Sequence, residues 1–205
     1  MNKIKFQYNI LRKKYGKPAG QWMLWGKRPK TFEEKEEIII GAILTQQTNW
    51  NNVMRALENF KNEKCLSLAR IYKLGKRDKN KLKELIKPSG FYNQKTEYLL
   101  NLVNFIIEKY KTLDNMEKVP ADILREELLK IKGIGEETAD SILLYAMEKP
   151  VFVIDEYTRR FCKENKITDV RSYSYLQKLF SDNLPKNYKL YQDYHALIVI
   201  DGKNS

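Results

Sequence analysis

Apolar residues recur along most of this chain every three to four positions, with polar residues between them. Such a period places the apolar side chains on one face of an α-helix. It is clearest where Leu99, Leu102, Val103, Ile106 and Tyr110 form a single stripe. Strand-like alternation is almost absent, and there are no repeats or low-complexity segments. The pattern therefore predicts an all-α fold.

Capping residues and helix breakers divide the pattern into segments. Thr31 with Glu34 three positions later has the form of a capping box, so a helix is expected to begin there. That helix is apolar on almost every side as far as Ile43, which predicts a central, buried position. The other predicted segments are a basic helix at 5–15, a loop at 16–29, a helix from about Trp50, a break at 88–90, an exposed turn at 91–93, and helices at 172–183 and 188–200.

The most ordered pattern is a pair of helices joined by glycines, at about residues 122–147. Gly133 and Gly135 flank Ile134; glycine permits positive φ and close backbone approach, and the isoleucine is expected to pack inward. The second helix then begins with amide N–H groups that lack an intrahelical partner, and the glycines leave them accessible. Such a helix end binds anions, most naturally a phosphate. A helical hairpin of no special function is the alternative.

One acidic residue follows this pair of helices at the end of an apolar run. Asp155 comes directly after residues 151–154, Val-Phe-Val-Ile, so it is expected at the edge of a packed core. Residues 156–159 have the form of a first helical turn, and aspartate is favoured as the N-cap of a helix. Asp155 is therefore a candidate for chemistry, for capping, or for both.

The charge of the chain narrows the classes of partner. Lys and Arg number 38 against 26 Asp and Glu, which gives a net charge of +12. Residues 1–30 contain nine basic residues and no acid, and residues 73–87 contain seven basic residues. Basic surface of this extent fits a polyanion such as nucleic acid. Solubility alone is the alternative explanation.

Composition also bounds location and cofactors. No apolar run approaches the roughly 20 residues that span a bilayer, and the N-terminus is charged where a signal peptide is apolar. We therefore expect a soluble, cytoplasmic protein with no membrane partner. Cys65 and Cys162 are the only cysteines, too few for a four-cysteine iron–sulfur cluster, and no metal site made of side chains is expected.

The string Leu-x-x-Ile-x-Gly-Ile-Gly-x-x-Thr-Ala-x-x-Ile, followed by Val-Ile-Asp-x-x-x-Arg-Arg, resembles the helix-hairpin-helix (HhH-GPD) DNA glycosylases of the endonuclease III superfamily. The resemblance implies two helical domains with a DNA-binding cleft between them. The first would be a helical barrel at 28–149, and the second would combine 1–27 with 150–205. It also implies a monomer that binds double-stranded DNA containing a damaged base.

The resemblance assigns roles to individual residues. It makes Asp155 catalytic, in the cleavage of the bond between a sugar and a base. Glu137 stands where relatives that also cut the strand have a lysine, which attacks the sugar and forms a Schiff base. Glutamate cannot form an imine, so a monofunctional enzyme is expected. Glu137 either lines the pocket or only favours the positive end of its helix.

Base flipping and DNA binding are assigned in the same way. Flipping needs side chains that fill the gap, and Gln46 and Phe91 match the family's wedge positions. A helix C-cap for Gln46 and loop packing for Phe91 are the alternatives. The expected phosphate contacts are Lys132, Gly133, Gly135, Thr138 and Arg159. A monovalent ion on the hairpin carbonyls is the one cofactor-like group that the resemblance suggests.

The lesion is less constrained than the reaction. Trp22, Trp25 and Trp50 would suit an electron-poor alkylated purine such as 3-methyladenine, through cation–π stacking. The chain resembles the 3-methyladenine DNA glycosylase III branch, which likewise lacks the lysine and the cluster. It departs from that branch because its tryptophans are not adjacent. Core packing is the alternative for the tryptophans, and His195, the sole histidine, is expected to be structural.

Three other functions stay open. The enzyme could remove an oxidised or mismatched base instead. It could be a lyase that recruits another lysine, for example Lys203. It could also be a DNA-binding module without catalysis, which keeps the hairpin only for phosphate contact.

Overall fold

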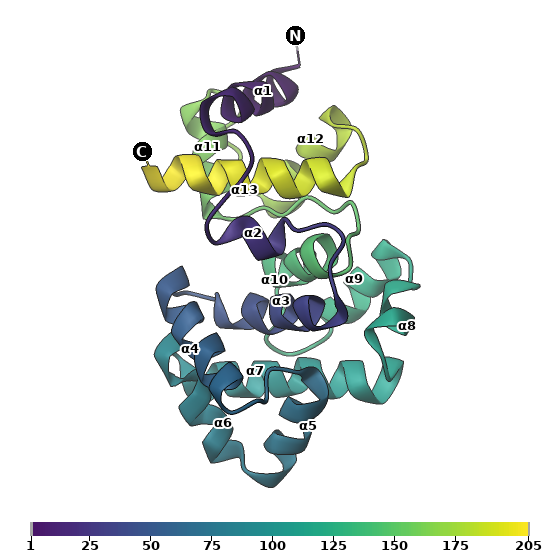
Figure 1. Cartoon of the computed structure of the whole chain (residues 1–205). Coiled ribbons are helices and arrows are strands. Elements are labelled where there is room, and N and C mark those ends of the chain that lie inside the picture. Colours follow the sequence, from purple (N-terminus) through teal and green to yellow (C-terminus); the bar gives the residue numbers. More distant parts are fainter. Residues whose placement is uncertain (1, 205) are drawn as a thin grey trace. The chain divides into compact units, whose positions relative to one another are not determined.

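A computed structural model of the chain describes residues 2–204. Within this range the protein is helical and contains no β-strand (Figure 1), which confirms the predicted all-α class. The helices are α1 (Lys3–Tyr15), α2 (Trp22–Trp25), α3 (Phe32–Leu44), α4 (Trp50–Asn62), α5 (Leu68–Arg77), α6 (Lys79–Ile86), the 3₁₀ turn η1 (Lys87–Ser89), α7 (Tyr92–Phe105), the π-helical turn η2 (Ile106–Tyr110), α8 (Leu113–Glu117), α9 (Ala121–Leu129), α10 (Glu136–Ser141), the π-helical turn η3 (Ile142–Ala146), α11 (Glu156–Glu164), α12 (Tyr173–Asn183) and α13 (Tyr188–Asn204).

The chain forms two compact units. The central unit is Pro29–Ile142, and the terminal unit combines the residues up to Arg28 with those from Leu143 onward. The division into functional domains at residues 28 and 149, with a cleft between them, stays a prediction.

The central unit is built around α3. The predicted capping box is present: the Thr31 hydroxyl accepts from the amide of Glu34, and the Glu34 carboxylate accepts from the amide of Thr31. Ile38, Ile39, Ile40 and Ile43 are fully buried, as the apolar pattern of this helix predicted. Helices α4 and α7 pack against α3, and the hairpin of α9 and α10 belongs to the same unit.

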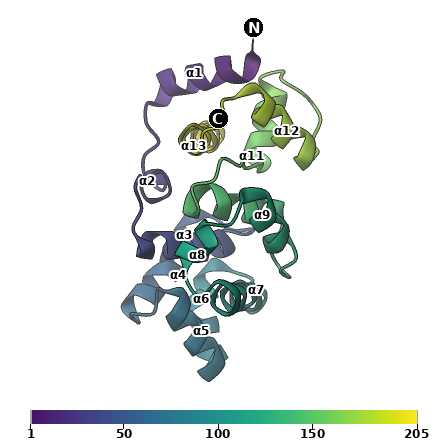
Figure 2. The ribbon, with the colours of Figure 1, turned by 90° about the vertical axis from the view of Figure 1, so that its right-hand side faces the viewer.

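The terminal unit brings the two ends of the sequence together. Helix α1 lies beside α13 (Figures 1 and 2), and the Tyr194 hydroxyl donates to the backbone oxygen of Ile4 at 2.9 Å. Phe152 stacks on Phe180 with ring centroids 4.2 Å apart, and both side chains are fully buried. This core places the residues just before α11.

Helix α2 was not predicted. The segment 16–29 was expected to be a loop, but it contains a single helical turn from Trp22 to Trp25. A four-residue turn is too short to show a period, and it has no side-chain cap. Its tryptophans hold it in place, because both rings pack against Tyr145 at centroid distances of 5.7 and 5.1 Å.

None of the helices formed by residues 2–204 has the length and apolar character needed to cross a lipid bilayer.

Candidate functional site

Asp155 is the N-cap of α11 and directly follows a buried apolar segment, residues 152–154. Phe152, Val153 and Ile154 are at most 1% exposed, and Asp155 itself is 8% exposed. Its Oδ1 accepts hydrogen bonds from the Thr158 amide at 2.7 Å and from the Thr158 hydroxyl at 2.8 Å. The capping role is thereby present in the structure. It uses Oδ1 and leaves Oδ2 available for other contacts.

That second oxygen faces a histidine. Asp155 Oδ2 lies 3.3 Å from His195 Nε2, and His195 Nδ1 lies 2.7 Å from the hydroxyl of the fully buried Tyr145. The three side chains form a line of polar groups through the core of the terminal unit. This contact was not predicted, because 40 positions separate Asp155 from His195 and nothing in the local pattern links them.

The surroundings of Asp155 set its protonation. Burial by itself raises the pKa of this carboxyl group, but the His195 ring and the hydrogen bonds from Thr158 outweigh it and lower the pKa below its ordinary value. The group is therefore held as a carboxylate despite being buried. A nearby Tyr145 hydroxyl has a pKa raised well above its ordinary value, mainly by burial and then by the charge of Asp155.

Two of the three tryptophans lie close to this group. Trp22 and Trp25 are each 7% exposed and meet edge to face at 6.1 Å, and Trp22 also lies edge-on to His195 at 5.7 Å. Trp50 belongs to the central unit, in the first turn of α4, and is half-buried. Within the terminal unit an open hollow of about 580 Å³ is lined in part by Trp22. Its other lining residues include Lys17, Met23, Arg28, Lys189 and Asp193.

The two glycines of the hairpin have different structural duties. Gly133 has φ +98°, and a Cβ added to it would lie 2.1 Å from the ring of Tyr98. Gly135 has φ −89°, and a Cβ added to it would meet nothing within 4 Å. Ile134 between them is 5% exposed, which confirms that it packs inward. Only the space beside Gly135 is therefore open in the way that the binding of an anion requires.

The start of α10 offers backbone donors next to that space. Gly135 is its N-cap and supplies no side-chain hydrogen bond. Lys132 and Glu137 are exposed, whereas Thr138 is 8% exposed. The hairpin is held from the other side by Arg125, which donates to both oxygens of the fully buried Asp140, at 2.7 and 3.1 Å.

The wedge candidates lie in two turns of the central unit. Gln46 follows α3, and its amide nitrogen donates to the Gly133 carbonyl oxygen at 3.0 Å and to the Thr138 hydroxyl at 3.1 Å. Phe91 precedes α7 with φ +46° and 60% exposure. A large apolar residue in the left-handed region, pointing into solvent, is costly on both counts. Positive φ also occurs at five other non-glycine residues within 2–204, and the wedge role of Phe91 stays a prediction.

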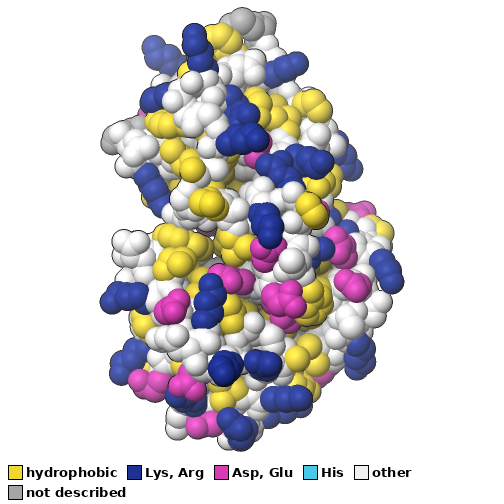
Figure 3. Space-filling model, in the orientation of Figure 1, with side chains coloured by type: hydrophobic (Ala, Val, Ile, Leu, Met, Phe, Trp, Pro, Cys, Tyr) yellow, Lys and Arg dark blue, Asp and Glu magenta, His cyan; other side chains and the backbone are white. Residues whose placement is uncertain are grey.

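Basic groups are spread over the molecule. Lys and Arg side chains lie over much of the face shown in Figure 3. Arg159 in α11 is half-buried; its Nε donates to the Arg171 carbonyl oxygen at 3.1 Å, and its guanidinium lies 5.9 Å from the centre of the Tyr173 ring.

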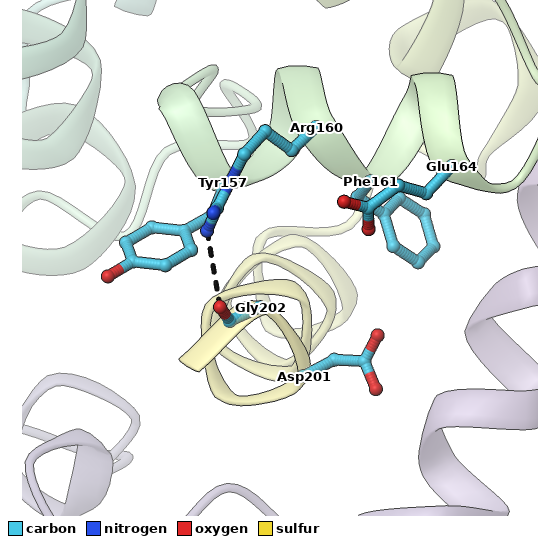
Figure 4. A pocket seen from close by; sticks show the side chains of 6 residues that line it. All are labelled: Tyr157, Arg160, Phe161, Glu164, Asp201 and Gly202. Carbon is cyan, nitrogen blue, oxygen red and sulfur yellow. Dashed lines mark hydrogen bonds between the residues drawn. The ribbon is translucent and has the colours of Figure 1, made fainter. Parts of the chain in front are cut away.

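A hollow of about 90 Å³ near the end of α13 is lined by none of the predicted site residues (Figure 4).

The residues available for metals are few. Cys65 and Cys162 are both buried and free, and no cluster of three or more His, Cys, Asp or Glu side chains suited to a metal occurs among residues 2–204. On the hairpin, the Gly133 and Lys132 carbonyl oxygens accept from the Gln46 and Asn101 side chains. A monovalent ion at the hairpin stays a prediction.

Comparison with known proteins adds a family. Residues 40–186 match the model of the HhH-GPD superfamily of base excision DNA repair proteins. The chain is 48% identical over 170 residues to a protein of Methanocaldococcus jannaschii named as a candidate DNA repair glycosylase, covering 82% of this chain and 76% of that one. It is 30% identical over 135 residues to endonuclease III of Thermotoga maritima, covering 64% of this chain and 58% of that protein.

Solved structures show the same architecture. The H. pylori 3-methyladenine DNA glycosylase bound to 1,N6-ethenoadenine is similar with a TM-score of 0.81 at 29% identity, covering 100% of this chain and 98% of that one. A trapped covalent complex of endonuclease III with DNA is similar with a TM-score of 0.75 at 20% identity, covering 98% and 85% of the two chains. The second match indicates a shared fold.

Proposed function

This chain belongs to the HhH-GPD superfamily of base excision DNA repair proteins, and we propose that it is a DNA glycosylase that removes a damaged base by hydrolysis and leaves the strand uncut. The observation that carries the proposal is the environment of Asp155, a buried carboxylate kept ionised by Thr158 and His195. The Thr158 contact also caps α11, whereas the His195 contact is one that a helix cap does not need.

The chemistry assigned to Asp155 follows from the reaction. As the bond between C1′ and the base nitrogen breaks, the base takes the electron pair and positive charge develops on the sugar. A carboxylate held close to that charge stabilises it, or accepts a proton from the water that bonds to C1′. Low local polarity strengthens the interaction. His195 and Thr158 then act as positioning residues, which fix the orientation of the carboxylate.

DNA is the proposed macromolecular substrate. The amides at the start of α10 and the open space beside Gly135 suit a backbone phosphate, with Lys132 and Thr138 as neighbours and Arg159 as a further contact. Gln46 and Phe91 are the proposed wedge. We propose a single copy of the chain as the active form.

An alkylated purine is the favoured lesion. Trp22 and Trp25 form an aromatic pair beside His195, and such a pair favours a ring that carries positive charge. Likeness to the structure of a 3-methyladenine DNA glycosylase, at 29% identity, supports the same class. A base of this kind leaves easily, so no strong general acid is required.

A panel of duplexes, each with one defined lesion, tests the function. We expect release of 3-methyladenine or a related alkylated purine, with an intact strand until the abasic site is cleaved by alkali. Asp155→Asn should bind the same DNA and lose at least about a hundredfold in rate, as expected for removal of a charge that acts on the transition state. Release of oxidised or mismatched bases alone would contradict the alkylated-purine assignment. Equal properties of wild type and Asp155→Asn would support a non-catalytic binding module.

One observation favours a second function, that of a lyase. Lys203 in α13 has a pKa lowered by burial, with the charge of Asp155 acting in the opposite direction, and its amine donates to the Gln21 side chain at 2.8 Å. A lowered pKa makes an amine a better nucleophile at neutral pH. Borohydride reduction in the presence of lesion DNA distinguishes the two functions. A trapped adduct that disappears in Lys203→Gln would establish the lyase, and no adduct is expected if Glu137 marks a purely hydrolytic enzyme.

A further inference from the structure

Lys95 is a buried cation with an unusual set of partners. It lies in the first turns of α7, is 2% exposed, and donates from Nζ to the carbonyl oxygens of Leu44 at 2.8 Å and Ser89 at 2.7 Å. Among residues 2–204, no carboxylate forms an ion pair with it. Burying an ammonium group without an opposite charge is costly. A residue of this kind is retained where its hydrogen bonds fix something that an apolar side chain would not.

The two carbonyl groups belong to the two turns that carry the wedge candidates. Leu44 is the last residue of α3, two positions before Gln46, and Ser89 ends η1, two positions before Phe91. The same lysine is therefore hydrogen-bonded to the start of both turns. Its backbone amide makes the first i to i+4 hydrogen bond of α7, to the Phe91 carbonyl oxygen at 2.9 Å.

Both turns contain a residue in the left-handed region. Gln47 has φ +50° and Phe91 has φ +46°, although neither is glycine. Each such conformation costs about 1–2 kcal/mol and persists only where the surroundings hold it. The bonds from Lys95 supply part of that restraint. The orphan carbonyl at the end of α3 is also the kind of group that a cation stabilises.

The first turn is in turn connected to the hairpin. Gln46 donates to the Gly133 carbonyl oxygen and to the Thr138 hydroxyl, so the turn whose first residue, Leu44, is bonded to Lys95 is also bonded to the hairpin loop. All of these residues belong to the central unit. Their relative positions are thus set within one compact body.

We propose that Lys95 is a positioning residue that holds the Gln46 and Phe91 turns at a fixed separation, so that both side chains enter the base stack together. The inference rests on the proposed glycosylase function. It assigns Lys95 to the extrusion of the base and not to the cleavage of the bond. The step affected is the one in which a paired base must leave the helix, which costs a few kcal/mol and is cheapest for a base that is already unpaired.

An experiment that measures base extrusion separately from bond cleavage tests the role of Lys95. Lys95→Met keeps an unbranched side chain, one atom shorter, and removes the donors. Glu36→Met is the matched control, because Glu36 is also buried in the central unit and also binds a backbone group, the Leu68 amide at 3.0 Å, at a different place. Single-turnover rates are measured for one lesion in a fully paired duplex and for the same lesion in an unpaired bulge. Fluorescence of 2-aminopurine placed next to the lesion reports opening of the stack.

We expect Lys95→Met to lose about tenfold on the paired lesion and less than about threefold on the bulged one, as for loss of a buried hydrogen bond used only in flipping. The 2-aminopurine signal should fall for the paired duplex. Glu36→Met should change both rates by the same factor. Equal losses on the two substrates for Lys95→Met, or no loss on either, would overturn the inference. If Lys95→Met does not fold, Lys95→Gln is measured against the same two criteria.

Failure of the proposed function gives a different result. In that case the wild type releases no base from any duplex of the lesion panel, and both proposals fall. An active wild type with identical losses on paired and bulged lesions removes the role of Lys95 and leaves the glycosylase proposal standing.

Discussion

The carboxylate of Asp155 is shared between a structural partner and a titratable one. Thr158 binds one oxygen through its amide and hydroxyl, and His195 lies 3.3 Å from the other. The cap alone would hold the start of α11 in place. The histidine faces the oxygen that the cap does not use, and this is the oxygen to which the proposed catalytic role belongs.

Replacing His195 by Gln tests the role of this contact. Burial raises the pKa of Asp155 and His195 opposes that effect, so the substitution should raise the pKa of the carboxyl group. The acid limb of kcat/KM should therefore move to higher pH. A pH–rate profile measures it, with Tyr145→Phe as the control that keeps His195. A lower rate with an unshifted acid limb would mean that His195 only supports the fold.

The same substitution has a consequence for stability. A carboxyl group with a lowered pKa in the folded state stabilises the protein above its ordinary pKa, and this contribution is lost as the pH falls through the lowered value. His195→Gln should thus begin to unfold at a higher pH in an acid titration than the wild type does. Circular dichroism follows the transition.

Lys95 predicts a change of stability with pH that has the same sign as that of Asp155 but falls at alkaline pH. Burial lowers its pKa from 10.5 to about 8. Between these values the unfolded chain binds more protons than the folded one, so the folded state gains stability as the pH rises through this window. The free energy of unfolding of wild type minus that of Lys95→Met should rise by about 2–3 kcal/mol between pH 8 and pH 10.5. Urea titrations at these pH values measure this change. A difference that does not vary with pH would contradict the lowered pKa of Lys95.

At the scale of single residues, the sequence predicts contacts between neighbours in the chain but not contacts between residues far apart in it. Asp155 could be identified as a cap because the residues that follow it form a recognisable first turn. Lys95 sits in a basic chain in which nothing marks one lysine among many as buried. The contact between Asp155 and His195 depends on how α11 packs against α13, which no local pattern encodes.

At the scale of elements, the hairpin shows how two similar glycines can serve different ends. Gly133 is required by its positive φ and by the ring of Tyr98, so it serves the fold. Gly135 is in an ordinary extended conformation with open space where a side chain would be. Its lack of a side chain matters only to something that approaches from outside.

Alanine at each position separates these roles. Gly133→Ala should lower the free energy of unfolding by about 2–4 kcal/mol, through backbone strain and collision with Tyr98. Gly135→Ala should change it by less than about 0.5 kcal/mol, and should weaken the binding of duplex DNA. Thermal unfolding and fluorescence anisotropy measure the two effects. Unchanged DNA binding by Gly135→Ala would show that the open space is not a phosphate site.

The predictable elements were those with a cap, a breaker or a long period. The capping box at Thr31, the glycine hairpin and the stripe from Leu99 onward all have such signals. The turn α2 does not, because its position depends on tryptophans packing on Tyr145, a residue more than a hundred positions away. The π-helical turns η2 and η3 likewise continue an apolar stripe without a local mark.

For the molecule as a whole, the net charge of +12 favours polyanionic partners. It does not indicate where on the surface a polyanion makes contact. The hairpin and Arg159 are the places at which we propose that DNA phosphates are bound. The proposal of DNA binding is therefore stronger if charge at these places matters more than charge elsewhere.

Salt dependence makes that comparison quantitative. Each phosphate contact contributes about −0.9 to the slope of log K against log salt for duplex DNA. Lys132→Gln and Arg159→Gln should each make the slope less steep by about one unit. Lys178→Gln is the matched control: it also lowers the net charge from +12 to +11, but Lys178 is paired with Asp182 on α12, at 2.9 Å. If all three variants change the slope equally, DNA is held by diffuse charge and the hairpin has no privileged role in binding.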